Sequence, residues 1–364
     1  MEAPDLPAEG DTIEQQIAFA DPVQSQQAGE DDQNVDFAAE RKERESGWGL
    51  EQAYVWGKVM RGRGYPAYFR PFEEVRGIPI RKVVAGGGYH WAALSINGQM
   101  YVCGQGEDGQ LGLGADIGSC DRPVLLGTLQ NKFVTQISVG VAQTAAVTAE
   151  GELYLWGTSS FDSQSVPRLV DALKGKRVEQ VALGLYHVAA LIREADEVST
   201  RVYTWGRGDK GQLGHGTRRE YRKPTIIEAL KKVNVLHIAS GEVHMAVITD
   251  KNRLIMWGSI VSPDSDKDLL GVPGSQSCIL KPKKIPRLKN VTMAACGARY
   301  TVAVTKSGAV FTWGYGNYGC LGHGTRENAV APLRVHALRR EVVKELSAGL
   351  YHCLVATEMD GSDE

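Results

Sequence analysis

Short apolar segments recur along the chain in a fixed order, separated by turns that carry glycine. The first recurring unit is an apolar strand, a Gly-x-x-His turn or a variant of it, and a second apolar strand. Six copies are present, at 83–94, 137–148, 181–192, 238–249, 294–305 and 346–357. The second unit is a strand that ends in Trp-Gly or, once, in Cys-Gly, at 54–57, 101–104, 153–157, 202–206, 254–258 and 310–314. Short apolar runs bounded by turn residues predict strands rather than helices.

Turn residues connect these units into a larger repeat. The segments INGQ (96–99), AEGE (149–152) and KSGA (306–309) are short hairpin turns between the two units. A glycine-rich loop follows Trp-Gly, for example GRGDKGQLGHG (206–216), and a strand that begins with proline comes after it. The repeat predicts four antiparallel strands every 44 to 57 residues, which is the size of one propeller blade.

The two ends of the repeat array are complementary. The first segment, AYVWG (53–57), is a second unit with no first unit before it, and the last, 346–357, is a first unit with no second unit after it. Pairing them would complete one blade from both chain ends and leave no open sheet edge. We therefore predict an all-β fold, a closed β-propeller of about six readable four-stranded blades, with the ring closed by the N- and C-terminal strands.

The net charge of −2 hides a division of the chain into regions of opposite charge. Residues 1–46 contain 13 Asp and Glu against three Lys and Arg. Such a segment buries too little apolar surface to fold, so we predict a disordered acidic tail over 1–46, a propeller over 47–358 and a disordered acidic end over 359–364. The tail either keeps the protein soluble or competes with an acidic partner for the basic body, and both hypotheses remain open.

Cysteine usage and hydropathy predict an intracellular address. The six cysteines stand singly, without a Cys-x-x-Cys pair, which indicates reduced thiols rather than a disulfide framework. No segment approaches the roughly 18 consecutive apolar residues of a membrane span, and the acidic N-terminus differs from an Arg-rich targeting sequence. We predict a cytoplasmic or nuclear protein with no membrane partner.

The combination of Gly-x-x-His, Trp-Gly and GQLGxG resembles the repeat of the regulator-of-chromosome-condensation family. The resemblance extends over about residues 50–357 and implies a propeller that in this family normally has seven blades. Members of the family that sense ultraviolet light place Trp inside the Gly-x-x-His turn. This chain has Gly88, Val141, Leu185, Glu242, Ala298 and Leu350 there, so we exclude light sensing.

The repeated side chains are predicted to hold the blades together. Burial of a tryptophan removes about 150–250 Å² from water, and five of them precede the repeated glycine: Trp56, Trp156, Trp205, Trp257 and Trp313. The turns carry one histidine per blade, at His90, His187, His244 and His352. No carboxylate or thiol stands beside these histidines at ligand spacing. We therefore predict hydrogen bonds to neighbouring backbone, with no metal and no other cofactor.

The largest break in the repeat is the segment 259–274, which replaces the GQLG loop. Its charged residues are Asp264, Asp266, Lys267 and Asp268. The founding member of the family, a nucleotide exchange factor for a small GTPase, is similar here, with an extended loop that inserts into the GTPase. The resemblance places Glu242 at an acidic position of that factor and Arg299 where the factor has a catalytically important Asp. We predict that these residues contact a protein partner.

Two further breaks are candidate binding surfaces. The loop 58–74 lacks GQLG and carries Arg61, Arg63, Tyr65 and Phe69, a composition typical of interface anchors. The same side chains would belong to the core if they cover one end of the ring. Basic segments at 218–223, 281–284 and 339–340 are either solvated or form one basic face for an acidic protein or nucleic acid.

Three functional hypotheses follow. The first is a non-catalytic scaffold that binds one or more proteins through its face loops, as a subunit or adaptor of a larger complex. The alternative is a guanine nucleotide exchange factor for a small GTPase, which is the only activity we expect if the protein has one. The third is a chromatin or nucleic-acid binder, which is disfavoured because the tail is acidic where that of the founding member is basic.

Overall fold

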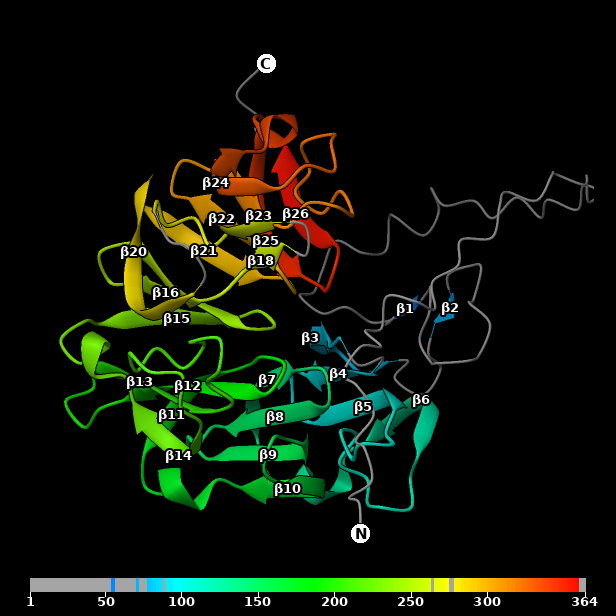
Figure 1. Cartoon of the computed structure of the whole chain (residues 1–364). Coiled ribbons are helices and arrows are strands. Elements are labelled where there is room, and N and C mark those ends of the chain that lie inside the picture. Colours follow the sequence, from blue (N-terminus) through cyan, green and yellow to red (C-terminus); the bar gives the residue numbers. More distant parts are fainter. Residues whose placement is uncertain are drawn as a thin grey trace, which may run out of the picture. The chain divides into compact units, whose positions relative to one another are not determined.

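The computed structural model describes residues 54–55, 70–71, 77–87, 90–262, 265–274 and 278–359. Within these ranges the chain is built from strands and short turns (Figure 1). Five four-stranded antiparallel sheets follow one another along the sequence, and neighbouring strands within each sheet are consecutive apart from one inserted hairpin. The predicted all-β architecture of four-stranded blades is confirmed.

Each blade contains the two predicted units and the predicted strand with proline. Blade 1 consists of β3 (Ile80–Ala85), β4 (His90–Ser95), β5 (Met100–Gln105) and β6 (Ser119–Leu125). Blade 2 consists of β7 (Val134–Val139), β8 (Gln143–Thr148), β9 (Leu153–Thr158) and β10 (Ser163–Leu169). Blade 3 consists of β11 (Arg177–Leu183), β12 (His187–Arg193), β13 (Thr200–Gly206) and β14 (Tyr221–Ile226). Blade 4 consists of β15 (Val235–Ser240), β16 (His244–Thr249), β17 (Arg253–Gly258) and β20 (Ile279–Lys289). Blade 5 consists of β21 (Val291–Cys296), β22 (Tyr300–Thr305), β23 (Val310–Gly314) and β24 (Ala329–Arg334).

Three two-stranded sheets complete the described strands. β25 (Glu341–Ala348) and β26 (Cys353–Met359) begin a sixth blade. β1 (Tyr54–Val55) pairs with β2 (Arg70–Pro71), and β18 (Val261–Ser262) pairs with β19 (Ser265–Asp268) inside the segment that breaks the repeat. Among the described strands β26 pairs only with β25. Closure of the ring through β1 and β26 therefore stays a prediction, and the predicted acidic tail over 1–46 lies outside the described residues.

Successive blades are joined along their first strands, which contact one another from blade to blade. The turns that follow these strands are linked by backbone hydrogen bonds. Leu185 N donates to Glu242 O at 3.0 Å, Glu242 N to Ala298 O at 3.1 Å, and Ala298 N to Leu350 O at 3.2 Å. Leu350 also lies next to the turn of blade 1, because a Cβ placed on Gly87 would be only 2.9 Å from Leu350 Cδ2. The turn of the sixth blade therefore contacts the turn of the first.

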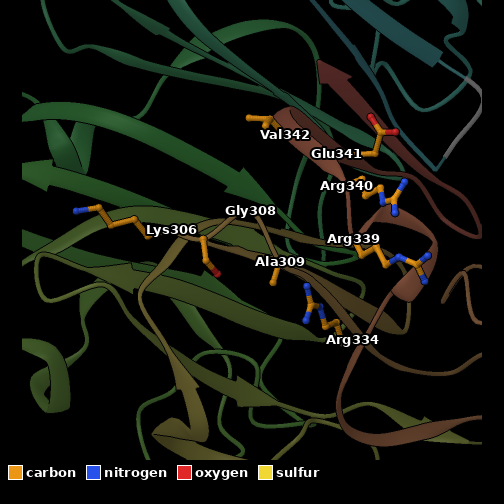
Figure 2. A pocket seen from close by; sticks show the side chains of 9 residues that line it. Lys306, Gly308, Ala309, Arg334, Arg339, Arg340, Glu341 and Val342 are labelled. Carbon is orange, nitrogen blue, oxygen red and sulfur yellow. The ribbon is translucent and has the colours of Figure 1, made fainter. Parts of the chain in front are cut away.

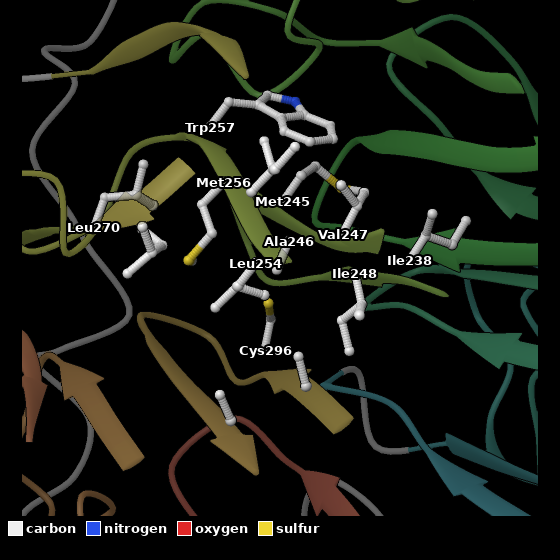
Figure 3. Packing of buried hydrophobic residues seen from close by; sticks show 14 of the residues in the cluster. Ile238, Met245, Ala246, Val247, Ile248, Leu254, Met256, Trp257, Leu270 and Cys296 are labelled. Atoms are coloured by element: carbon white, nitrogen blue, oxygen red, sulfur yellow. The ribbon is translucent and has the colours of Figure 1, made fainter. Parts of the chain in front are cut away.

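Two of the repeated tryptophans, Trp156 and Trp257, bind into the glycine-rich loop of the preceding blade, and Trp56 lies outside the described residues. Trp257 Nε1 donates to Gln212 O at 2.8 Å, and a Cβ on Gly214 would lie 2.8 Å from the same nitrogen. Trp156 makes the same bond to Gln110 O at 2.9 Å. Figure 3 shows Trp257 among the side chains of β16 and β17 that form the core of blade 4. The predicted role of the tryptophans in holding blades together is thus accounted for by a specific socket.

Three of the four repeated histidines join neighbouring blades through hydroxyl groups, and His244 also bonds the backbone of Tyr300, the kind of partner expected from the sequence. The fourth, His352, is exposed. His90 is hydrogen-bonded to Thr144 Oγ1 at 2.9 Å, His187 to Ser240 Oγ at 3.0 Å and His244 to Thr301 Oγ1 at 3.2 Å. The turn glycine is required because a Cβ on Gly184 would lie 2.0 Å from His187 Cε1. In the turns of blades 3, 4 and 6 the glycine is therefore packed directly against the histidine ring.

Within the residues that the structure describes, four single turns of 3-10 helix, which the sequence did not predict, separate the fourth strand of a blade from the next blade. They are η3 (Gly127–Leu129), η4 (Asp171–Leu173), η5 (Glu228–Leu230) and η6 (His336–Leu338). The final leucine is buried in the first three. No helix in the described part of the chain is long and apolar enough to cross a membrane.

Mild acid is expected to destabilise the protein because its buried histidines are neutral in the fold. Burial lowers the pKa of His187 to about 4 and that of His244 to about 3, whereas an unfolded histidine titrates near pH 6.5. The unfolded state therefore binds protons first, and stability falls as the pH drops below about 6.5. As the pH falls, the free energy of unfolding should decrease by up to about 1.4 kcal/mol per pH unit for each of these two histidines. The decrease should stop only when the pH reaches their pKa values in the folded state.

Urea unfolding between pH 7.5 and 5 measures this slope. Burial also lowers the pKa of His215, His237 and His323, which adds to the loss in the same direction. His187→Gln is the matched variant, because Gln143 occupies the equivalent position in blade 2, and it should reduce the slope. A free energy of unfolding that stays constant over this pH range would contradict the assignment.

Candidate protein-interaction face

The loops that follow Trp-Gly lie beside the Gly-x-x-His turns. The residue after Trp-Gly donates its backbone N–H to a carbonyl of the turn: Arg207 to Tyr186 at 2.8 Å, Ser259 to Val243 at 3.0 Å and Tyr315 to Arg299 at 2.8 Å. The turns of blades 3 to 6 are linked to one another by the bonds described above. Their partly exposed side chains therefore form one continuous surface, here called the turn face: Tyr186, Arg207, Glu242, Arg299, Tyr318 and Tyr351.

Glu242 and Arg299, both predicted site residues, form an ion pair on the turn face. Arg299 Nε lies 3.3 Å from Glu242 Oε2, and the exposed fractions of the two side chains are 40% for Arg299 and 20% for Glu242. The two residues are on adjacent turns, so the pair bridges blades 4 and 5. The resemblance places Arg299 where the exchange factor of the family has an Asp, and here the positive charge of Arg299 is balanced by the carboxylate of Glu242.

Aromatic side chains flank this ion pair, and the sequence analysis did not select them. The rings of Tyr318 and Tyr351 lie 4.4 Å apart between centroids, and both are exposed. On the other side Arg207 lies over the ring of Tyr186 at 5.9 Å and pairs with Asp209 at 2.9 Å. The signal in the sequence was the second variable position of the turn, which carries tyrosine in several copies. Tyrosine and arginine are enriched among the few residues that contribute most of the binding free energy of a protein interface.

The inserted segment 259–274 is fixed at both ends next to the turn face. Ile260 and Leu269 are buried and joined by a backbone hydrogen bond of 2.8 Å. Asp268, a predicted contact residue, is 6% exposed, and its Oδ1 accepts the N–H of Leu270 at 3.1 Å. Trp313 Nε1 donates to Leu270 O at 3.1 Å. The end of the insertion therefore provides the tryptophan socket that GQLG provides elsewhere.

Several predicted residues cannot be placed on this surface. Asp264 lies outside the described residues, and the side chains of Asp266 and Lys267 are likewise outside the description. Arg61, Arg63, Tyr65 and Phe69 also lie outside the described residues.

The basic segments are divided between the two ends of the strands. Arg218 Nη2 lies 3.1 Å from Cys278 Sγ, so 218–223 and 281–284 are neighbours. Tyr221 lies opposite Gly206 at the turn end, and Lys284 lies opposite Ile255 in the middle of β17. Residues 339–340 precede β25, at the end of the strands away from the turns.

Comparison with known proteins gives a consistent result. The model of the regulator of chromosome condensation (RCC1) repeat matches residues 97–147, 150–191, 200–248 and 307–356. The chain is 33% identical to human E3 ubiquitin-protein ligase HERC2 over 86% of its own length, but spans 7% of that protein. It is 32% identical to the Arabidopsis thaliana ultraviolet-B receptor UVR8, over 77% of this chain and 64% of the receptor.

Solved structures agree with the fold. Human WBSCR16 superimposes with a TM-score of 0.71 at 21% identity, covering 84% of this chain and 81% of that one. Prp20p from Saccharomyces cerevisiae, described with its binding to Gsp1p and histones, gives a TM-score of 0.57 at 18% identity and covers 87% of this chain and 93% of its own.

Proposed function

The chain belongs to the RCC1 repeat family, and from this premise we propose that it is a non-catalytic scaffold that recognises a partner protein through the turn face. The observation that carries the proposal is the continuity of this surface over four blades, on which an ion pair lies between the half-buried Tyr186 and the exposed pair Tyr318 and Tyr351. Three of the repeated histidines and three of the repeated tryptophans are occupied in joining blades, which leaves recognition to the residues that vary between turns.

The chemistry of the turn face fits a protein surface. Glu242 and Arg299 present one acceptor and one donor group at fixed positions, because each stands on a turn that is hydrogen-bonded to the next. Tyr318 and Tyr351 add apolar ring surface that a partner can cover, and their hydroxyl groups can form hydrogen bonds with polar groups at the edge of the interface. The partner expected from these groups is a protein with a complementary charged pair beside an apolar patch.

Removing the ion pair should release the partner. In affinity isolation followed by mass spectrometry, we expect the variant Glu242→Ala/Arg299→Ala to lose proteins retained by the wild type by at least about tenfold, because truncated interface charges leave their partners unpaired. The matched control is Glu179→Ala/Arg193→Ala. It removes an ion pair of 2.7 Å with similar burial, at the end of β12 away from the turn. Equal loss from both variants would refute the turn face as the binding surface.

A charge-swapped variant separates recognition from stability. Glu242→Arg/Arg299→Glu keeps an ion pair between blades 4 and 5 and should melt like the wild type. It reverses the polarity offered to the partner, so binding should still be lost. Full retention of the same partners by this variant would mean that the pair only stabilises the blades.

Guanine nucleotide exchange is the second candidate function, favoured by the insertion that begins at Ser259 beside the turn of Glu242. Against it, Arg299 pairs with that acidic group at 3.3 Å. An exchange factor works by remodelling the switch loops of a GTPase rather than by covalent chemistry. Release of labelled nucleotide from a panel of small GTPases decides between the two functions, since a pure scaffold accelerates none of them.

A further inference from the structure

A recurring hydrogen bond closes the joint between a hairpin and the next blade. The hairpin joins the second and third strands of one blade and meets the start of the following blade, at the end of the strands away from the turn face. Val134 N donates to Gly98 O, Val178 N to Gly151 O and Val291 N to Asn252 O, each at 3.0 Å. These three joints are therefore filled by backbone in direct contact.

The joint between blades 5 and 6 is open. Gly308 occupies the hairpin position there, and a Cβ placed on it would meet only Glu341 O, at 3.7 Å. Among the described residues no backbone hydrogen bond joins Gly308 to Val343, the counterpart of the three valines. A pocket of about 270 Å³ occupies this joint, lined by the hairpin 306–309, Arg334 and residues 339–342.

The walls of this pocket are strongly basic. Lys306, Arg334, Arg339 and Arg340 line it against a single carboxylate, that of Glu341. All four basic residues are exposed, and none forms an ion pair with any side chain that the structure describes. Figure 2 shows the three arginines on one side of Gly308 and Ala309, with Lys306 on the other. By contrast, Lys132 in blade 2 is neutralised by Glu152 at 2.8 Å.

We propose that this pocket binds a phosphoryl group carried by a phosphorylated segment of a protein. Three guanidinium groups provide paired N–H donors, which match the several acceptor oxygens and the double charge of a phosphate monoester. A carboxylate has fewer acceptors and half the charge. A nucleic acid requires a row of cations along its backbone, whereas the basic segment 218–223 lies at the opposite end of the strands.

The test uses the full chain and a simple probe, the blocked tripeptide Ala-phosphoserine-Ala, in calorimetric titration at low salt. The comparison ligands are Ala-Glu-Ala, inorganic phosphate and an oligothymidylate. We expect the phosphopeptide to bind at least about tenfold more tightly than the glutamate peptide, because its charge-assisted bonds are stronger and more numerous. Competition by inorganic phosphate at higher concentration would support the phosphoryl group as the recognised element.

Arg339→Gln/Arg340→Gln should weaken phosphopeptide binding at least about tenfold, and Lys283→Gln/Lys284→Gln is the control because these exposed lysines lie on β20, outside the pocket. If the double variant fails to fold, Arg334→Gln replaces it. The proposal is overturned if phosphopeptide binding is undetectable, if the control weakens it equally, or if the glutamate peptide or the oligothymidylate binds as tightly. The site is separate from the turn face, so failure here leaves the proposed scaffold function untouched.

Discussion

Deletion of residues 346–364 is expected to produce a chain that aggregates instead of unfolding cooperatively. The deletion removes all of β26 and the end of β25, whose side chains Leu346, Cys353 and Val355 pack against the core of blade 5. It also removes the carbonyl of Leu350 that accepts the N–H of Ala298 at 3.2 Å. An apolar cluster and an unpaired strand edge would then be exposed together, which is the usual origin of edge-to-edge association.

Thermal unfolding followed by circular dichroism and light scattering provides the measurement. Deletion of 360–364 alone is the control and should leave the melting temperature unchanged. A chain without 346–364 that melts cooperatively at the temperature of the intact protein would contradict closure of the ring by its two ends.

A point substitution tests the same closure more finely. The sequence assigns AYVWG to the third strand of the blade begun by β25 and β26. A pocket of about 340 Å³ lies between β26 and the glycine-rich loop of blade 5, and Leu321, Gly322 and Tyr351 are among the residues that line it. Gly322 corresponds to Gly214, which packs against Trp257. Trp56→Ala should therefore cost about 3–5 kcal/mol of unfolding free energy, whereas Trp48→Ala, outside the repeat, should have little effect.

Trp257→Ala is expected to lower the free energy of unfolding by about 3–5 kcal/mol, the typical cost of a large cavity in a core. Trp257 is 0% exposed, and its Nε1 donates to Gln212 O at 2.8 Å. The substitution leaves that carbonyl unsatisfied and separates blade 4 from the loop of blade 3. Urea unfolding gives the value.

Two variants bracket the effect of the tryptophan. Trp257→Phe retains most of the packing and loses the hydrogen bond, so its cost should be smaller. Tyr318→Ala removes a ring that is 51% exposed and should change stability little. A loss from Trp257→Ala no greater than that from Tyr318→Ala would show that the socket does not join the blades.

The strands could be predicted from the sequence because every blade solves the same packing problem with the same residues. ISVGVAQTAAVT (137–148) became β7 and β8, although β7 begins earlier, at Val134. The 3-10 turns were missed because one turn of helix has no periodicity to detect. The hydroxyl partners of the histidines were missed because Ser240 lies 53 residues from His187, and sequence position does not reveal such contacts.

The candidate site was only partly predictable for the same reason. Glu242 and Arg299 were selected separately, but the ion pair between them joins positions 57 residues apart. Asp268 was selected for its charge, whereas its carboxylate supports the backbone of the insertion. The retained Leu270-Gly271 socket inside that insertion was not recognised, because its register with GQLG is set by folding around Trp313.

Each turn from blade 3 to blade 6 is linked to the next by a hydrogen bond between main-chain N–H and C=O groups, and the Glu242–Arg299 ion pair adds a side-chain link between blades 4 and 5. Substitution of the partly exposed side chain at Leu185, Glu242 or Leu350 therefore leaves the backbone donor and acceptor of each link in place. Specificity can then diverge by point mutation while the mechanical framework is conserved. A surface of this kind is suited to evolving new partners after gene duplication, and to laboratory selection of binders from libraries randomised at these positions.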